Sequence, residues 1–289
     1  MGTDLTASST EPANRDEPVR TIVYTSPTQE LVGGRGTFSP TTATLVAGRS
    51  ESVLIDAQYM SADIEALGDL IERSGTTLTA IYVTHGHGDH YFGIGKLLER
   101  FPGARPVATA AVVAYVESTL EVQTAQWQAM FGDGAVTPTV LPEPMVGTSI
   151  GLEGVELNVI DVGQGDIKPS TVVHIPAIDT VISGDVIYNQ IHAMLGFAGR
   201  DGWREWISSI DQVERLAPHV IVAGHKKPDA SDRAVKEMLD GTRSYIEDFV
   251  DAAEDAGDAK ELEAAVLAKY PDLGNPWTLR FSAQAWFAS

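Results

Sequence analysis

Three of the seven histidines in the chain lie within six residues, in the segment His85-Gly-His-Gly-Asp-His90. Neutral imidazole and carboxylate are the usual protein ligands of Zn²⁺ and related divalent ions when thiolate is absent, and this chain has no cysteine. Alternate side chains of such a loop can be directed at one ion and the next pair at a second. The intervening glycines let the backbone approach a bound ion closely. The segment therefore predicts a metal site.

Two further candidate ligands, Asp185 and His225, share a local pattern with His85. Each follows a short apolar run that predicts a β-strand: Ile81-Tyr-Val-Thr-His85, Val181-Ile-Ser-Gly-Asp185 and Val220-Ile-Val-Ala-Gly-His225. Ligand sites in α/β proteins gather at strand ends, where loops converge on a rigid sheet. We therefore expect these strands to stop at their ligands and to bring them together at one edge.

Strands and helices alternate along the chain in loose blocks, which predicts a layered α/β domain with helices outside. A helix is expected over 61–73 with Ser61 as its cap, and another over 109–131 with Thr109 as its cap. The segment 132–151 is rich in proline and glycine and predicts a connection. Further strands are expected at 42–46, 52–55, 78–83, 155–160, 171–175, 180–182 and 219–222, and further helices at 93–101, 203–216, 231–256 and 259–270.

Composition narrows the class of partner. Residues 1–18 are polar and predict a disordered leader, followed by a single domain over 19–289 whose C-terminal end, about 231–289, is helical. The leader has no apolar core of a secretory signal, and no apolar run reaches the length of a membrane span, so a cytoplasmic protein without membrane contact is expected. The formal charge of −20 disfavours nucleic acid. We expect a small-molecule substrate; homo- or hetero-oligomers remain open.

The motif His85-Gly-His-Gly-Asp-His90 resembles the signature loop of the metallo-β-lactamase superfamily. The resemblance extends to Asp56 after an apolar strand, to Gly184-Asp185 and to Gly224-His225, in the family's order. It implies an αββα four-layer sandwich with a dinuclear site between the two sheets. For the substrate it is uninformative, because the superfamily includes lactamases, lactonases, thioesterases, sulfatases, nucleases and iron-dependent redox enzymes.

The resemblance also assigns ligands. It implies His85 and His87 at the first metal, Asp89, His90 and His225 at the second, and Asp185 as a bridge. The family's third histidine of the first site is missing, and Gln164 stands in its place. A glutamine oxygen is a neutral, poorer donor. Gln164 could therefore ligate weakly, Asp166 could substitute, or the first site could be partly empty; we expect a weakened first site. The cofactor is expected to be one or two Zn²⁺ ions, with iron or manganese as alternatives.

Other residues are candidates for contact with the substrate. Tyr188 stands at the position where lactonase-like members place a phenol near the scissile carbonyl, where it could stabilise negative charge. His192 follows one turn later and is expected at the same pocket. Trp127 and Phe131 are candidates for an apolar pocket wall.

The leading hypothesis is a metallo-β-lactamase-fold hydrolase, in which metal-bound hydroxide attacks a small ester, lactone or similar electrophile. Asp89 would orient the water and accept its proton. A mononuclear iron dioxygenase-type enzyme is one alternative, compatible with an incomplete dinuclear site. A partner-dependent subunit with a degenerate first metal site is another.

Overall fold

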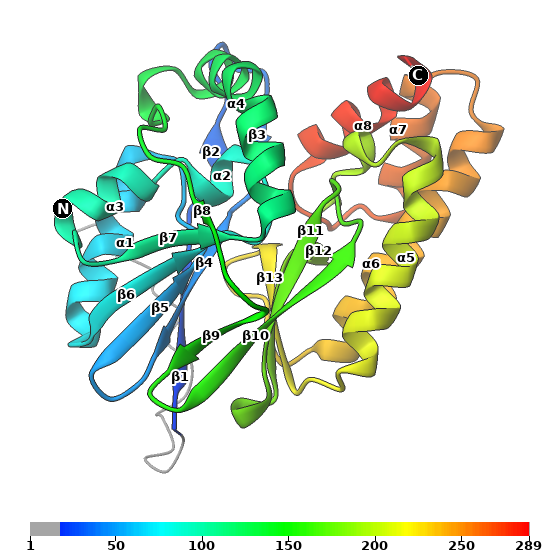
Figure 1. The fold of residues 1–289 in the computed structure, drawn as a ribbon. Coiled ribbons are helices and arrows are strands. Elements are labelled where there is room, and N and C mark those ends of the chain that lie inside the picture. Colours follow the sequence, from blue (N-terminus) through cyan, green and yellow to red (C-terminus); the bar gives the residue numbers. More distant parts are fainter. Residues whose placement is uncertain (1–17, 289) are drawn as a thin grey trace.

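Two β-sheets pack face to face between layers of helices in the computed structural model, which describes residues 18–288 (Figure 1). One group of buried apolar side chains fills the space between the sheets, and two others fill the space between each sheet and its helices. The predicted α/β class and αββα four-layer sandwich are thereby confirmed. The predicted leader, residues 1–18, lies outside the described residues except for Pro18.

The first sheet has six strands in the order β1-β4-β5-β6-β7-β8. Pairing is antiparallel from β1 to β5 and parallel from β5 to β8. The elements of this half are β1 (Arg20–Thr25), β2 (Gln29–Glu30), β3 (Thr37–Phe38), β4 (Thr42–Ala47), β5 (Glu51–Ile55), α1 (Ser61–Ser74), β6 (Thr77–Tyr82), α2 (Gly88–Tyr91), α3 (Ile94–Arg100), β7 (Arg105–Ala108), α4 (Ala110–Phe131), a 3-10 turn (Gly132–Gly134) and β8 (Glu143–Pro144).

The second sheet has five strands in the order β13-β12-β11-β10-β9 and is covered by α5 and α6. All its pairs are antiparallel except β12 with β13. Its elements are β9 (Ser149–Leu152), β10 (Val155–Gly163), β11 (Ser170–Ile175), a 3-10 turn (Pro176–Ile178), β12 (Thr180–Asn189), η3 (Leu195–Phe197), α5 (Gly199–Arg215), β13 (Val220–Lys226), α6 (Val235–Asp255), α7 (Ala259–Lys269) and α8 (Pro276–Ala288).

The helix starts follow the sequence pattern in one case and depart from it in another. The Thr109 side chain accepts a hydrogen bond from the Val112 N–H, so the predicted cap of α4 is confirmed. The predicted Ser61 cap is wrong, because Met60 is the residue before α1 and Ser61 is already its first helical residue. Helix α1 ends at Ser74 and is followed by Gly75, whose left-handed backbone favours glycine.

Two of the three ligand-bearing strands do not stop at their ligands. β6 ends at Tyr82, shortly before His85, as predicted, but β12 runs on past Asp185 to Asn189 and β13 runs past His225 to Lys226. The prediction that each strand stops at its ligand is therefore wrong for β12 and β13. Their side chains reach the site because the register of β12 shifts beside them.

The C-terminal segment is helical, as expected, and holds α6, α7 and α8. The segment 132–151 is not a plain connection, because it contains β8 and the start of β9, each at the edge of its sheet. None of the described helices combines the length and apolarity that crossing a membrane would require.

Candidate metal centre

The histidine-rich loop follows β6 and turns at once into the short helix α2, which carries Asp89 and His90. The two glycines of the loop are required by crowding. A Cβ at Gly86 would lie 2.4 Å from the Tyr115 ring, and one at Gly88 would lie 2.8 Å from both Phe92 and Trp127. The loop can therefore pack under α4 only with glycine at these positions, and this packing fixes the histidines between them.

A local distortion brings Asp185 and His225 together from neighbouring strands. The pairing of β12 with β13 shifts on both sides of Gly184, which has a φ of 47°. A Cβ at Gly224 would lie 2.1 Å from the Asp185 Oδ1 atom, so only glycine lets β13 pass beside this carboxylate. As a result the His225 Nε2 atom lies 3.1 Å from Asp185 Oδ2.

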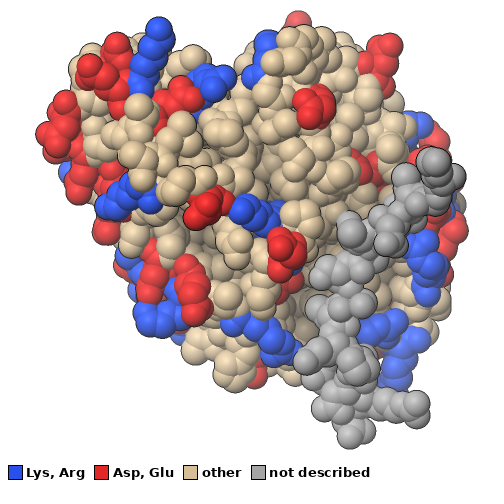
Figure 2. Space-filling view, turned by 180° about the vertical axis from the view of Figure 1, so that it is seen from behind, with Lys and Arg blue, Asp and Glu red and all other residues tan. Residues whose placement is uncertain are grey.

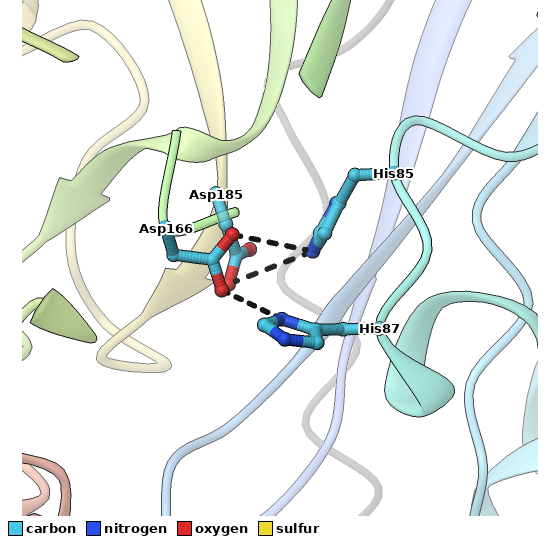
Figure 3. A group of neighbouring side chains, drawn as sticks. All are labelled: His85, His87, Asp166 and Asp185. Carbon is cyan, nitrogen blue, oxygen red and sulfur yellow. Dashed lines mark ion pairs between the residues drawn. The ribbon is translucent and has the colours of Figure 1, made fainter. Parts of the chain in front are cut away.

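Four side chains form the first of two groups that could hold a metal ion: His85, His87, Asp166 and Asp185 (Figure 3). Their ligand atoms lie within 4.8 Å of one another. The His87 Nδ1 atom is 2.6 Å from Asp166 Oδ2, and the His85 Nε2 atom is 3.7 Å from Asp166 Oδ1 and 4.0 Å from Asp185 Oδ2. The histidines converge on the two carboxylates from the opposite half of the sandwich (Figure 3).

Asp89, His90 and His225 form the second group. Asp89 Oδ2 lies 3.5 Å from the His90 Nε2 atom and 3.3 Å from the His225 Nε2 atom. Asp185 adjoins this group as well, because its Oδ1 atom is 3.3 Å from His90 Nε2. A single carboxylate thus contacts histidines of both groups, the position that the resemblance implies for a bridging ligand.

Several of these ligand atoms are buried without a hydrogen-bond partner: the Nε2 atoms of His85 and His90, and Asp185 Oδ1. Buried polar atoms are nearly always paired, so such a concentration needs an explanation. Divalent ions would satisfy all of them at once, and imidazole with carboxylate is a suitable donor set. The residues present therefore fit bound metal ions.

Further side chains fix the orientation of the histidines. Asp56 Oδ2 lies 2.8 Å from His90 Nδ1, and Asp56 also accepts hydrogen bonds from the backbone N–H and the hydroxyl of Thr84. The His225 Nδ1 atom lies 2.9 Å from the Ser39 hydroxyl and 3.0 Å from the Pro40 carbonyl oxygen. In both rings the Nδ1 contacts leave Nε2 directed at the site.

Two groups of the site, His85 and Asp185, are in the ionisation state that metal binding requires. Burial, followed by the charge of the neighbouring His90, lowers the pKa of His85 well below its usual value, so this imidazole is neutral. Burial raises the pKa of Asp185, but the nearby His225 and His90 lower it by more, so that the pKa lies well below the usual range. A neutral imidazole and an ionised carboxylate are the forms that bind metal. Burial lowers the pKa of His225, but the nearby Asp185 and Asp89 raise it by more, to about 10, so this ring must release a proton when a metal ion binds.

The sequence leaves open whether Gln164 ligates weakly, Asp166 substitutes for it or the first site is partly empty. The geometry favours Asp166. The Asp166 carboxylate belongs to the first group, and its Oδ1 atom is fixed by the Ile167 N–H at 2.7 Å. The Gln164 amide instead donates to the Gly165 carbonyl oxygen at 3.0 Å, and its amide carbon packs close to Gly202. Gln164 is not among the residues that line the cavity beside the two groups.

A cavity of about 400 Å³ opens onto both groups and is lined by Asp89, Asp166 and Asp185, among others. Of the four predicted substrate contacts, Tyr188 and Trp127 line the cavity. Phe131 and His192 do not. Phe131 lies behind Trp127, against which it stacks at 5.3 Å. His192 is fully buried elsewhere, with its Nδ1 atom 3.1 Å from the Tyr245 hydroxyl.

Sequence reasoning missed Gln123, which fastens the histidine-rich loop to α4. Its buried side chain accepts a hydrogen bond from the Gly88 N–H at 2.9 Å and donates to the Gly86 carbonyl oxygen at 2.7 Å. Glutamine in the middle of a helix carries no signal for this role. Its partners lie more than thirty residues earlier in the chain, and only the fold brings them together.

Replacing Gln123 by leucine is expected to weaken metal binding about tenfold without unfolding the protein. The change keeps the volume on α4 but removes both hydrogen bonds that hold the loop, and loss of such support costs roughly 10–100-fold in metal affinity. Titration of the metal-stripped variant by calorimetry would measure this. Gln126→Leu, one turn on along the same helix, is the matched control, and an equal loss there would refute the specific role of Gln123.

A sequence model described as the metallo-beta-lactamase superfamily matches residues 36–225. A hydroxyacylglutathione hydrolase from Francisella tularensis subsp. novicida is 37% identical over 76 residues, which are 26% of this chain and 26% of that protein. The chain thus spans about a quarter of the length of this curated relative.

Solved structures share the fold at low identity. A metallo-beta-lactamase family protein from Thermus thermophilus superposes with a TM-score of 0.63 at 18% identity, covering 90% of each chain. A metallo-beta-lactamase from Pontibacter korlensis superposes with a TM-score of 0.59 at 19% identity, covering 82% of this chain and 97% of the other. These likenesses concern the fold and leave the substrate open.

Proposed function

The chain belongs to the metallo-beta-lactamase superfamily, and on that premise we propose that it hydrolyses a small ester, lactone or similar electrophile with the help of divalent metal ions. One observation carries the proposal: two adjoining groups of buried histidine and aspartate side chains, with unpartnered ligand atoms, open onto one cavity. The hydroxyacylglutathione hydrolase similar to part of this chain adds thioesters to the substrates worth testing.

The proposed metal ligands are His85, His87, Asp166 and Asp185 in the first group and Asp89, His90 and His225 in the second, with Asp185 between them. When bound, divalent ions would supply acidified water as the nucleophile and would polarise the carbonyl group of the substrate. Zinc is the proposed metal, because buried imidazole and carboxylate suit it, and iron and manganese accept the same donors.

Asp89 and Tyr188 are the proposed catalytic side chains. Asp89 lines the cavity, and its Oδ2 atom accepts a hydrogen bond from the Thr41 hydroxyl, which supports a role in orienting the attacking water and accepting its proton. Burial, followed by the Asp185 charge, raises the pKa of Tyr188 well above its usual value, so the phenol keeps its proton. It donates to Asp185 at 2.9 Å and, by turning, could donate to a developing oxyanion.

We propose that the substrate is a small molecule and not a nucleic acid. Acidic and basic side chains are interspersed over the face drawn in Figure 2, and the chain as a whole carries a formal charge of −20. Binding to a phosphate backbone would need a continuous basic surface.

The two alternatives from the sequence receive less support. A mononuclear iron enzyme needs only one group of ligands, whereas the described residues offer two, each buried. A degenerate first site would lack a donor, whereas Asp166 joins that group.

Metal analysis combined with a substrate panel tests the proposed function. Protein purified without added ions is expected to contain between one and two divalent ions per chain and to hydrolyse members of a panel of chromogenic esters, lactones, thioesters and β-lactams. Chelation should abolish this activity and added zinc should restore it. Oxygen uptake with an iron-loaded sample and no hydrolysis of any panel member would overturn the proposal in favour of redox chemistry.

A further inference from the structure

Away from the metal groups, the cavity is walled by apolar and aromatic side chains on two facing sides. Helix α4 contributes Val122, Trp127 and Met130, and helix α8 contributes Trp277 and Phe281. The two helices flank the upper end of the sandwich, one above each sheet (Figure 1). Between them lies a space of the size that takes a drug-sized ligand.

The wall on α8 lies outside residues 36–225, the part of the chain that matches the superfamily. Its aromatic rings form a continuous series that leads to the metal groups. Trp277 stacks on Phe281 at 5.6 Å, Phe281 contacts Phe197 at 5.1 Å, and Phe197 contacts His87 at 4.9 Å. Part of the cavity wall is therefore built by a segment that the family match does not include.

The mouth of the cavity is apolar as well. Val122 and Phe197 belong to its lining although 60% and 47% of their surfaces are exposed. Val32, which is 51% exposed, lies next to Met130 of the lining, because its N–H donates to the carbonyl oxygen of Met130. Exposed apolar residues that are gathered at one opening, and not scattered singly, mark a binding site.

Positive charge is scarce at this opening. Among the described residues of the lining, Arg35 is the one lysine or arginine. Two of its donors are engaged by backbone carbonyl oxygens, since Nε donates to Val32 at 2.9 Å and Nη2 donates to Ala129 at 2.5 Å. The guanidinium keeps its charge and its other N–H donors, so Arg35 is a cationic side chain of the described lining that a carboxylate or phosphate could meet. Elsewhere between α4 and α8 such a group would lose its hydration without compensation, which is unfavourable.

We infer that the substrate carries a large, uncharged apolar group, acyl or aromatic, which lies between α4 and α8 while its electrophilic carbon faces the metal groups. The inference rests on the proposed function and deepens it by naming the substrate class. It separates this chain from hydrolases whose substrates carry an anionic group away from the scissile bond.

A matched pair of fluorescent probes tests the inference without catalysis. N-phenyl-1-naphthylamine is neutral, and 8-anilino-1-naphthalenesulfonate is its close analogue with a negative charge. The purified metal-loaded protein is expected to bind one molecule of the neutral probe per chain, at least about tenfold more tightly than the anionic one. Val122→Lys places a cation at the mouth and should tighten binding of the anionic probe several-fold. Val146→Lys is the control, because Val146 is 97% exposed and does not line the cavity.

Binding of the anionic probe as tightly as the neutral one would overturn the inference, above all if Arg35→Gln abolished it. An equal gain from Val122→Lys and Val146→Lys would also overturn it, because the binding would then not be local to the cavity mouth.

A substrate pair extends the test to turnover. The kcat/KM for p-nitrophenyl hexanoate should exceed that for the acetate by on the order of tenfold or more, since four methylenes become buried. The mono-p-nitrophenyl ester of adipic acid, which carries a carboxylate at the chain end, should be cleaved at least about tenfold less efficiently than the hexanoate. Equal cleavage of all three esters would overturn the inference while leaving the proposed function intact. Selective binding of the neutral probe without cleavage of any ester, thioester or lactone would overturn the proposed function and would support the assignment of the cavity.

Discussion

Replacing His90 or His225 by alanine is expected to abolish hydrolysis and to lower the metal content by about one ion per chain. Both rings belong to the second group, and both contact Asp89 and Asp185 through Nε2. Removing either imidazole leaves two buried carboxylates facing each other with one neutralising partner fewer. Within the described part of the chain the group has three members, so the loss of one leaves no spare donor to replace it.

Elemental analysis after dialysis, together with the initial rate on the best panel substrate, would measure both effects. His192→Gln is the matched control: His192 is also fully buried, but it contacts Tyr245 and does not line the cavity. It should keep its metal and its activity. Full activity in His90→Ala or His225→Ala would contradict the proposed ligand set, and loss of metal in the control would mean that the effect reflects unfolding.

Most of the proposed metal ligands could be predicted from the sequence because they belong to local patterns. The loop from His85 to His90 carries four of the proposed ligands within six residues, and Asp185 and His225 each follow an apolar run beside a glycine. Such patterns depend on neighbours in the chain. The αββα layering could be anticipated for a similar reason, since it reflects the alternation of strands and helices together with the resemblance.

What could not be predicted depends on contacts between distant segments. The register of β12 shifts beside Gly184, where a Cβ would lie 2.7 Å from the hydroxyl oxygen of Thr84, a hundred residues earlier in the chain. Trp277 and Phe281 lie in an ordinary-looking helical segment, and nothing local indicates that α8 would return to wall the cavity opposite α4. His192 has the spacing of a pocket residue but faces Tyr245, because the chain turns away after β12.

Asp166→Asn is expected to weaken binding of one of the two ions by about 100-fold or more, whereas Gln164→His should change it less than about tenfold. Asparagine keeps the volume of Asp166 and can still accept the Ile167 N–H, so the loop should hold its conformation. It removes the negative charge that faces His85 and His87, at 3.7 Å and 2.6 Å. Gln164, by contrast, donates to the backbone of Gly165, and a histidine there would have to displace that contact before reaching the site.

Metal titrations of the stripped wild-type protein and both variants would separate the two residues. A weakly bound ion in Asp166→Asn, with two well-bound ions in the wild type, would make Asp166 the donor that stands in for the family's third histidine. If Gln164→His instead tightened the first site strongly while Asp166→Asn left it unchanged, the weakened site expected from the sequence would be correct. Asp166 would then act on His87 through their direct contact and not as a ligand, and the glutamine would be the cause of the weaker affinity.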